Sequence, residues 1–371
     1  MPRRADTYRG NLMQKVAASR TTLVSVESLE KFCIAVLKKA GLSEPNAITL
    51  AESLSFADAR GLTAHGVARL PEYLARVRAG AMNLEPTMEI EQDHPASALL
   101  NANNGLGQIA GVKAMEIAIK KARTAGVGLV GVKNSNHFGS AAFFAMRAME
   151  ADMIGLVLTN AAPSIAPYGA KVPLVGTNPI TVAIPAASKL PIVLDMATSL
   201  VARGKIWLAS LAGQKIPLGW ALDKDGKSTE DPDAALNGGS LEPIGGPKGS
   251  GLSLIIDLLC GVLTGTTLSG DVKLIMDLSG PMNTSHLLMA INIGSFVNVE
   301  QFKKNIDEVI LRIKTLPSIQ GPPAFLPGEI EFEKAEKCRA VGIPFSADLL
   351  TSLGELAERY GVPRLETRFD A

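Results

Sequence analysis

Hydrophobic positions near the start of the chain recur at the spacing of helices. Ser25 can cap such a stripe and Gly41 can end it, while Pro45 suits the first turn of the next one. Thr63 can cap a third stripe of the same kind. The pattern predicts three helices in this region, over residues 25–40, 43–59 and 63–80.

Farther along, short apolar runs typical of buried strands alternate with helical spacing. The expected strands cover residues 96–100, 127–132, 154–159, 180–184, 192–194 and a run from 285. The expected helices cover residues 109–124, 140–151, 252–263, 299–315, 331–340 and 346–360. Residues 220–236 are expected to form a surface excursion. Because the strands are confined to the middle of the chain, we predict an α/β (α+β) core with helical segments at both ends.

The composition limits the class of protein. The chain has 371 residues, enough for two domains, and 47% hydrophobic residues, enough for a sizeable core. Its net charge of +1, without a basic stripe, is no electrostatic footprint for nucleic acid. We therefore expect a globular protein that does not bind nucleic acid.

Cysteine usage and the N-terminus bear on the cellular compartment. The three cysteines, Cys33, Cys260 and Cys338, are far apart and form neither a disulfide framework nor a zinc pattern, so a reducing cytoplasm is expected. The most apolar segment is too short to span a membrane, and the N-terminus lacks the apolar region of a secretory signal. Residues 1–23 are expected to be a disordered extension or the result of an early start codon, in preference to a transit peptide.

Among four histidines, His137 has the most suggestive surroundings. It lies in Asn134-Ser135-Asn136-His137-Phe138-Gly139, between the apolar run at 127–132 and a helical stretch. Such strand-to-helix junctions collect reactive groups in α/β proteins. Catalytic and structural roles both fit this pattern.

His65 and Arg69 are four residues apart, so a continuous helix would project them from one face. An imidazole carries protons and a guanidinium binds carboxylates bidentately, which suits an acidic substrate. The alternative is a solvated turn without a chemical role.

A glycine pattern at Gly105, Gly107 and Gly111 opens a helix within a βαβ unit, as a Rossmann fingerprint does. The acidic residue that would bind the ribose is missing, because the second strand ends in Val132-Lys133-Asn134. A second match, over residues 126–131, lies inside the expected strand and cannot form the required turn. We therefore predict that Gly105 and Gly107 are structural turn residues and do not hold a pyrophosphate.

Two further stretches carry groups suited to ligand binding. Asp195 follows a strand and precedes a helix that Thr198 or Ser199 can cap; it can orient a histidine, bind a ribose hydroxyl or form a plain turn. Lys248 lies among glycines at the start of an apolar helix, which favours a phosphate or a carboxylate. The stretch is not a Walker A loop, and a solvated lysine in a glycine-rich elbow is the alternative.

Together these stretches resemble the malate/L-lactate dehydrogenase family of NAD(P)-dependent oxidoreductases, which also includes ureidoglycolate, sulfolactate and diketogulonate enzymes and differs from the Rossmann-type lactate and malate dehydrogenases. The resemblance extends from about residue 24 to the C-terminus. Ala64 replaces a usual serine, and Ala161 stands where a hydroxyl is often found. The motifs that carry the resemblance are His65-Gly66-Val67-Ala68-Arg69, Ser135-Asn136-His137-Phe138-Gly139, Thr177-Asn178-Pro179, residues 194–199, Gly246-Pro247-Lys248-Gly249, His286 with Ala290-Ile291, and Pro327-Gly328-Glu329.

The resemblance implies a central mixed-sheet cofactor domain at residues 95–310, not of Rossmann type, and a helical, substrate-side domain from residues 24–94 and 311–371. It implies NAD or NADP as cofactor, no metal and a homodimer. His137 and His65 would be the acid/base candidates, and Arg69 would bind the substrate carboxylate. The implied cofactor contacts are Ala161, Asp195, Met196, Ala197, Lys248, His286, Leu287, Leu288, Pro327, Gly328 and Glu329.

The implied chemistry is hydride transfer between a nicotinamide and a small 2-hydroxy acid or its 2-oxo acid. An imidazole, with an ordinary pKa of about 6.5, can take the hydroxyl proton or return it. Reduction of a cyclic imine or of a sugar-derived 2-oxo acid is the alternative within the family. A phosphate- or nucleotide-binding protein lacks an evident carboxylate cluster for Mg²⁺, and a metal-dependent hydrolase lacks ligand spacing such as H-E-x-x-H.

Overall fold

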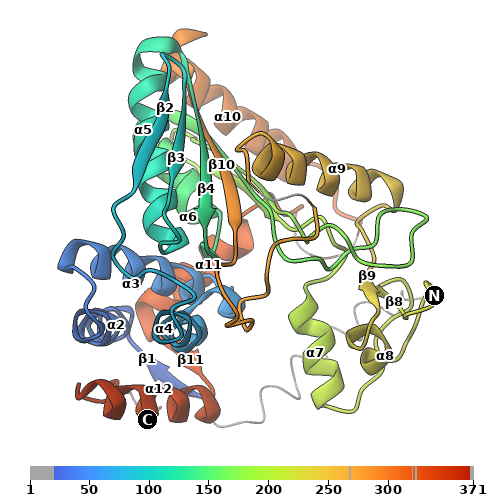
Figure 1. The fold of residues 1–371 in the computed structure, drawn as a ribbon. Coiled ribbons are helices and arrows are strands. Elements are labelled where there is room, and N and C mark those ends of the chain that lie inside the picture. The colour runs from blue at the N-terminus through green and yellow to red at the C-terminus, as the bar shows by residue number, and fades with distance from the viewer. Residues whose placement is uncertain (1–20, 267–268, 320, 322–323, 368–371) are drawn as a thin grey trace. The chain divides into compact units, whose positions relative to one another are not determined.

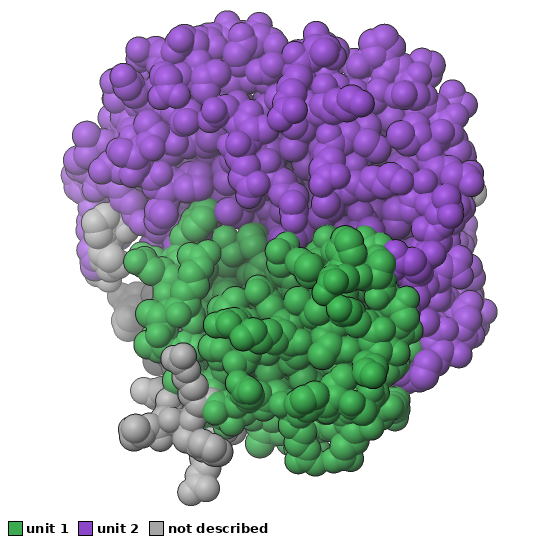
Figure 2. Space-filling model, turned by 90° about the vertical axis from the view of Figure 1, so that its left-hand side faces the viewer, with its two compact units in different colours: residues 1–74, 331–371 green, residues 75–330 purple. Residues whose placement is uncertain are grey.

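The computed structural model describes residues 21–266, 269–319, 321 and 324–367 (Figure 1). They fall into two compact units, which Figure 2 colours separately. One unit combines the chain up to Leu74 with the chain from Glu331 onward, and the other is Ala75–Ile330. The domain limits predicted from the sequence, after residue 94 and before residue 311, stay a prediction.

The first unit is mainly helical, and its first helix confirms the expected stripe. Ser25 accepts a hydrogen bond from the Ser28 backbone at 3.0 Å, and Gly41 ends the helix at φ 104°. The buried stripe includes Leu29, Cys33 and Val36. The elements of this unit are β1 (Thr22–Val24), α2 (Val26–Ala40), α3 (Glu44–Ala59), the 3₁₀ turns η1 (Thr63–His65) and η2 (Val67–Arg69), β11 (Ile343–Phe345) and α12 (Ala347–Tyr360), with parts of α4 (Leu70–Arg78) and α11 (Glu329–Val341).

The N-terminal extension predicted for residues 1–23 includes two residues that belong to a strand. Thr22 and Leu23 belong to β1, which pairs antiparallel with β11, so Thr22 faces Phe345. Residues 1–20 lie outside the described part of the chain. The short β1–β11 ladder joins the two chain ends within the first unit, a pairing across more than three hundred residues that local patterns do not reveal.

A seven-stranded sheet forms the centre of the second unit, in the order β2-β3-β4-β10-β5-β6-β7. Among the strands of the described residues, β3 and β4 pair in parallel and the other neighbours in this sheet pair antiparallel, so the predicted mixed sheet is confirmed. The strands are β2 (Glu89–Asp93), β3 (Ser97–Asn101), β4 (Val127–Ser135), β5 (Met153–Thr159), β6 (Ile180–Ile184), β7 (Ile192–Met196) and β10 (Thr284–Asn292).

Helices cover both faces of this sheet (Figure 1). A Cβ at Gly128 in β4 would lie 1.9 Å from the carbonyl oxygen of Ala118, so glycine lets α5 (Gly107–Ala125) approach this strand closely. Side chains alternate along a strand, and the opposite face packs against α9 (Pro247–Asp257) and the π-helical turn η3 (Leu258–Val262). The helix α6 (Ala142–Glu150) lies on the same face as α5.

Residues 220–236, which were expected to form a surface excursion, are mostly exposed or half-buried but are packed against the rest of the unit. Ala221 and Ala235 are buried in a cluster around Ile165, and Trp220 packs against it. Two short paired strands and two short helices therefore form a packed lobe around this cluster. Its elements are α7 (Arg203–Leu211), β8 (Ala221–Leu222), α8 (Pro232–Leu236) and β9 (Ser240–Leu241).

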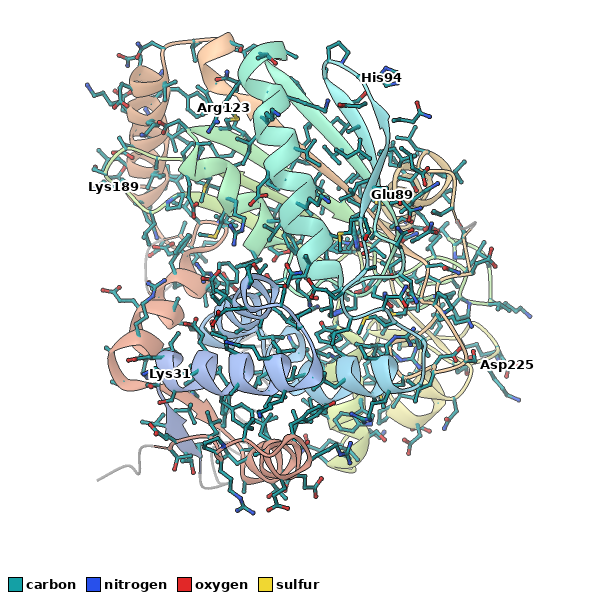
Figure 3. The ribbon with its side chains drawn as sticks, turned by 60° about the vertical axis from the view of Figure 1, so that its left-hand side comes forward. Lys31, Glu89, His94, Arg123, Lys189 and Asp225 are labelled. Carbon is teal, nitrogen blue, oxygen red and sulfur yellow. The ribbon has the colours of Figure 1, made fainter. Side chains whose placement is uncertain are left out.

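Two elements lie at the periphery of the second unit. The strand β2, which the sequence pattern did not predict, is exposed along its whole length, with Glu89 at its start and His94 just after its end (Figure 3). The amphipathic helix α10 (Val299–Lys314) follows the turn η4 (Ile293–Ser295), as expected from its spacing. Among the described residues, no helix combines the length and the apolar character that crossing a membrane requires.

Candidate active site

The His137 loop connects β4 to α6, as the sequence predicted. Asn136 anchors it, because its buried amide donates to the Asn104 carbonyl at 3.0 Å and the Gly105 carbonyl at 2.9 Å. Gly139 takes φ 80°, a left-handed conformation that glycine adopts easily. The half-buried His137 is thus held by a rigid loop.

The next residue, Phe138, stacks on the ring of His286, with centroids 4.4 Å apart and planes 11° from parallel. His286 is fully buried; its Nδ1 lies 2.7 Å from Thr159 Oγ1 and its Nε2 lies 2.9 Å from Ser135 Oγ. Burial lowers the pKa of His286 to about 3, because a desolvated ring resists charging. His286 is therefore a neutral imidazole that supports the His137 loop by stacking on Phe138.

The neighbouring positions on β10 are covered too. Leu287 has 6% and Leu288 has 0% of its surface exposed, because β10 lies in the middle of the sheet. Contact of His286, Leu287 and Leu288 with a cofactor stays a prediction, and the covered surface of these residues gives it no support.

Asp195 is brought to the His137 loop from a strand 55 residues farther on. Its Oδ2 accepts hydrogen bonds from Ser140 Oγ at 3.1 Å and from the Ala142 backbone at 3.2 Å. Its Oδ1 accepts one from Thr181 Oγ1 at 2.7 Å. An exposed carboxylate is thereby fixed at the N-terminus of α6, where the helix dipole favours negative charge. Ser140 and Thr181, which hold it, were not recognised from the sequence.

The expected helix start after Asp195 was wrong. The strand β7 runs on through Met196, and α7 begins only after Ala202. The segment between is used elsewhere, since the Thr198 backbone donates to Thr177 at 3.2 Å and accepts from Ile244 at 2.8 Å. The first bond joins residues 196–199 to the segment around Thr177, and the second joins them to the loop that leads to Lys248.

Lys248 lies exposed in the first turn of α9, after Gly246 at φ 62°. The Ala161 segment meets the same helix through Asn178, whose Oδ1 accepts from the Ala161 backbone and whose Nδ2 donates to the Ser253 carbonyl, each at 2.9 Å. Three stretches predicted to contact a cofactor, at Ala161, Met196–Ala197 and Lys248, are therefore linked by hydrogen bonds. Asn178 belonged to a motif of the resemblance, but its anchoring role was missed.

The Pro327-Gly328-Glu329 loop lies against β7. The Val193 backbone donates to the Pro327 carbonyl at 3.0 Å. Gly328 has φ 88°, and a Cβ at this position would lie only 2.9 Å from the Val193 carbonyl oxygen. The Glu329 carboxylate binds Lys314 Nζ at 2.5 Å and the Leu326 backbone at 2.9 Å. The loop is thus fixed two residues from Asp195, with the Glu329 side chain turned to Lys314.

His65 and Arg69 belong to the helical unit, and the predicted continuous helix through them was wrong. They occupy two separate 3₁₀ turns, because Gly66 between the turns is extended at φ −90° and ψ −155°. The α-helical projection of both side chains from one face therefore does not hold. Arg69 Nε donates to the Ala64 carbonyl at 2.7 Å, and its Nη1 pairs with Glu72 at 2.6 Å.

The break between these turns is caused by Asp58, which the sequence reasoning overlooked. This residue is 3% exposed, and its Oδ2 accepts from the Val67 backbone at 2.7 Å. A Cβ at Gly66 would lie 1.9 Å from Asp58 Oδ1, which has no hydrogen-bond partner among the described residues. Burial raises the pKa of the Asp58 carboxyl to about 7, although the Val67 hydrogen bond opposes the shift.

Gly107 marks the close approach of α5 to the His137 loop. A Cβ there would lie 2.3 Å from the Asn136 carbonyl oxygen and 2.7 Å from that of His137. We expect Gly107→Ala to destabilise the fold by about 1–3 kcal/mol, as overpacking does. Denaturant unfolding measures this, with Gly251→Ala as control, because a Cβ at Gly251 meets nothing within 4 Å. A Gly107→Ala variant of full stability that has lost cofactor affinity would restore the Rossmann interpretation.

Comparison with known proteins identifies the family. The model of the malate/L-lactate dehydrogenase family matches residues 24–354. The chain belongs to this family. It is 41% identical to the malate dehydrogenase of Pyrococcus abyssi, covering 92% of this chain and 95% of that one. It is 35% identical to the NAD(+) ureidoglycolate dehydrogenase of Escherichia coli K12, over 88% and 93% of the two chains.

Solved structures agree with this membership. The sulfolactate dehydrogenase of Methanocaldococcus jannaschii matches with a TM-score of 0.87 and 40% identity, over 92% of this chain and 98% of that one. The resemblance inferred from the motifs is therefore confirmed, and the chain is a dehydrogenase of the malate/L-lactate dehydrogenase family.

Proposed function

We propose that this dehydrogenase interconverts a small 2-hydroxy acid and its 2-oxo acid by hydride transfer to or from NAD or NADP. The observation that carries the proposal is the hydrogen bond from Ser140, in the segment after His137, to Asp195. This bond links the proposed proton carrier to a predicted cofactor contact. The names of relatives that act on malate, sulfolactate and ureidoglycolate support a 2-hydroxy acid as the substrate.

The proposed roles follow from the chemistry of each group. His137 takes the hydroxyl proton during oxidation and returns it during reduction, because an imidazole titrates near neutral pH. His65 orients the substrate, and Arg69 binds its carboxylate through a planar guanidinium. Of the two imidazoles we favour His137 as the proton carrier, because its loop is bonded to Asp195.

The residues around Asp195 and Lys248 fit a nicotinamide dinucleotide, which would accept or donate the hydride when bound. Lys248 and the N-terminus of α9 suit a phosphate. The exposed Asp195 carboxylate suits a hydroxyl. Ala161, Met196, Ala197 and the Pro327-Gly328-Glu329 loop lie on segments bonded to these two, so we propose them as further contacts in a cofactor domain that is not of Rossmann type.

An absorbance assay with NADH and NADPH against a panel of 2-oxo acids tests the function. We expect oxidation of one reduced cofactor with at least one acid, without added metal and in the presence of a chelator. Activity that disappears with the chelator and returns with zinc or magnesium would contradict the proposal. The same panel decides between NAD and NADP and identifies the preferred acid.

Replacing Lys248 by alanine is expected to raise the KM for the cofactor more than the KM for the acid, because a cation at a helix N-terminus is lost. Fluorescence titration with NADH measures the change in affinity directly. Lys205→Ala, which removes an exposed lysine from α7, is the control. Equal cofactor affinity in wild type and Lys248→Ala would leave Lys248 a solvated elbow residue.

Replacing Arg69 by alanine is expected to raise the KM for the acid by about 10- to 150-fold, since a charge-assisted hydrogen bond contributes roughly 1.5–3 kcal/mol. The KM for the cofactor should change little. Steady-state kinetics at saturating cofactor measures both. A variant that loses kcat with an unchanged KM would place Arg69 in the chemical step and not in binding.

We also propose a homodimer in a reducing cytoplasm. Apolar side chains on α9 and just beyond it, including Leu254, Ile255 and Val262, are 40–53% exposed, a surface that a second copy of the chain would cover. None of the three cysteines forms a disulfide in the structure. Light scattering coupled to size exclusion is expected to give twice the mass of the chain.

A further inference from the structure

Glu72 stands against the arginine that we propose as the carboxylate clamp. Its carboxylate lies 2.6 Å from Arg69 Nη1, with side-chain exposures of 23% for Glu72 and 28% for Arg69. A second nitrogen of the guanidinium is engaged as well, because Nε of Arg69 donates to the Ala64 carbonyl at 2.7 Å. Two of the three nitrogens of Arg69 are therefore occupied, one by the Ala64 carbonyl in η1 and one by the Glu72 carboxylate in α4.

This arrangement affects how an acid can bind. A carboxylate that binds bidentately needs two adjacent nitrogens, either Nη1 with Nη2 or Nε with Nη2. Each of these pairs includes one nitrogen that already donates to Glu72 or to Ala64. A substrate carboxylate must therefore share or displace either Glu72 at Nη1 or the Ala64 carbonyl at Nε, and in both modes it binds the guanidinium that Glu72 already pairs with.

The position of Glu72 follows from the local fold. It lies three residues after Arg69, at the passage from the turn η2 into α4, where Leu70 is helical at φ −58° and ψ −45°. Residues three apart are neighbours on a helix surface. The pair is thus built into the start of α4 and needs no other part of the chain.

We propose that Glu72 is a specificity-determining residue of this dehydrogenase: it competes with the substrate carboxylate for Arg69 and weakens the binding of acids that carry a second negative group. The inference rests on the proposed function of Arg69. A partly exposed ion pair changes an equilibrium constant by up to about fivefold. An additional negative group on the substrate is repelled by Glu72 as well, so the effect is larger for a dianion.

The variant Glu72→Gln keeps the size of the side chain and removes its charge. We expect its KM for malate to fall by about three- to fivefold and its KM for lactate to fall less, with little change in kcat or in the cofactor KM. Glu72→Ala is the second variant. Glu358→Gln is the matched control, because Glu358 pairs with Arg364 in the same unit on the exposed end of α12.

Calorimetric binding of malonate, an unreactive dianion, separates this inference from the function on which it rests. Tighter malonate binding by Glu72→Gln in a protein without dehydrogenase activity would support the inference and overturn the function. Activity in the wild type with an unchanged or higher malate KM in both Glu72 variants would overturn the inference alone. In that outcome Glu72 merely holds Arg69 in place.

Discussion

Replacing His137 by alanine is expected to lower kcat by about 100- to 10,000-fold and to remove the pH dependence of the rate near neutrality. The reason is that, in the proposed mechanism, the His137 imidazole takes or returns the hydroxyl proton of the substrate. The loop that carries His137 is fixed by Asn136 and by the Phe138–His286 stack, so the loss is not attributable to a mobile segment. Steady-state pH–rate profiles of kcat and kcat/KM measure it.

His65→Ala is the comparison for this variant. If His65 orients the substrate, its loss raises KM more than it lowers kcat and leaves the pH profile in place. The reverse result, with the pH dependence lost in His65→Ala alone, would exchange the two roles. Near-normal kcat and unchanged profiles in both variants would require another group to move the proton.

Replacing Asp58 by asparagine is expected to remove a fall in stability between about pH 4 and pH 7. Burial raises the pKa of Asp58 to about 7 in the folded chain, whereas an unfolded aspartate titrates near its ordinary value of about 3.9. Between these values the folded state binds more protons, so the free energy of unfolding falls as the pH rises. The difference of about three pKa units corresponds to on the order of 4 kcal/mol.

Denaturant unfolding across this pH range measures the effect. Asp307→Asn is a control that should leave the pH dependence between pH 4 and pH 7 unchanged, because the Ser188 hydroxyl and the backbone of residues 187–189 bind Asp307 and hold its pKa at about 2. The stability from Asp307 is present above the ordinary aspartate pKa and is lost as the pH falls. An Asp58→Asn curve that parallels the wild-type curve from pH 4 to pH 8 would show that Asp58 does not titrate there.

Asp58 also matters for the interpretation of enzyme kinetics. It anchors the Val67 backbone between His65 and Arg69, and its titration falls in the range expected for an imidazole. A pH profile of the wild type can therefore contain a contribution from this turn. Repeating the His137 comparison in the Asp58→Asn background separates proton transfer from the stability of the turn.

The sequence predicted the local elements well wherever a single physical signal decides them. The stripe from Leu29 to Leu37 with its Ser25 cap and Gly41 end required only helical periodicity and capping chemistry. The strand-to-helix junction around His137 followed from an apolar run next to an Ala- and Phe-rich stretch. The motif order predicted the family because it depends on residue identities and not on their contacts.

The remaining features depend on partners far away in the chain. Placement of β10 between β4 and β5 reflects pairing across about 130 or more residues, for which periodicity gives no signal. The helix expected through His65 and Arg69 is interrupted because Asp58 binds the Val67 backbone between them. Gly66 fits beside Asp58 because it has no Cβ. The hydrogen bonds from Ser140 and Thr181 to Asp195 likewise could not be predicted, because these residues become neighbours only when the sheet has formed.

Deuterium transfer tests the central claim most directly. The 2-hydroxy acid that corresponds to the 2-oxo acid preferred in the substrate panel is deuterated at C2 and oxidised with the preferred nicotinamide cofactor, and the reduced cofactor is analysed by mass spectrometry. We expect one deuterium in the reduced cofactor, because the C2–D bond breaks with its electron pair moving to the nicotinamide while the hydroxyl proton moves to an imidazole. Deuterium found in the solvent, with unlabelled reduced cofactor, would contradict hydride transfer and the function proposed for this chain.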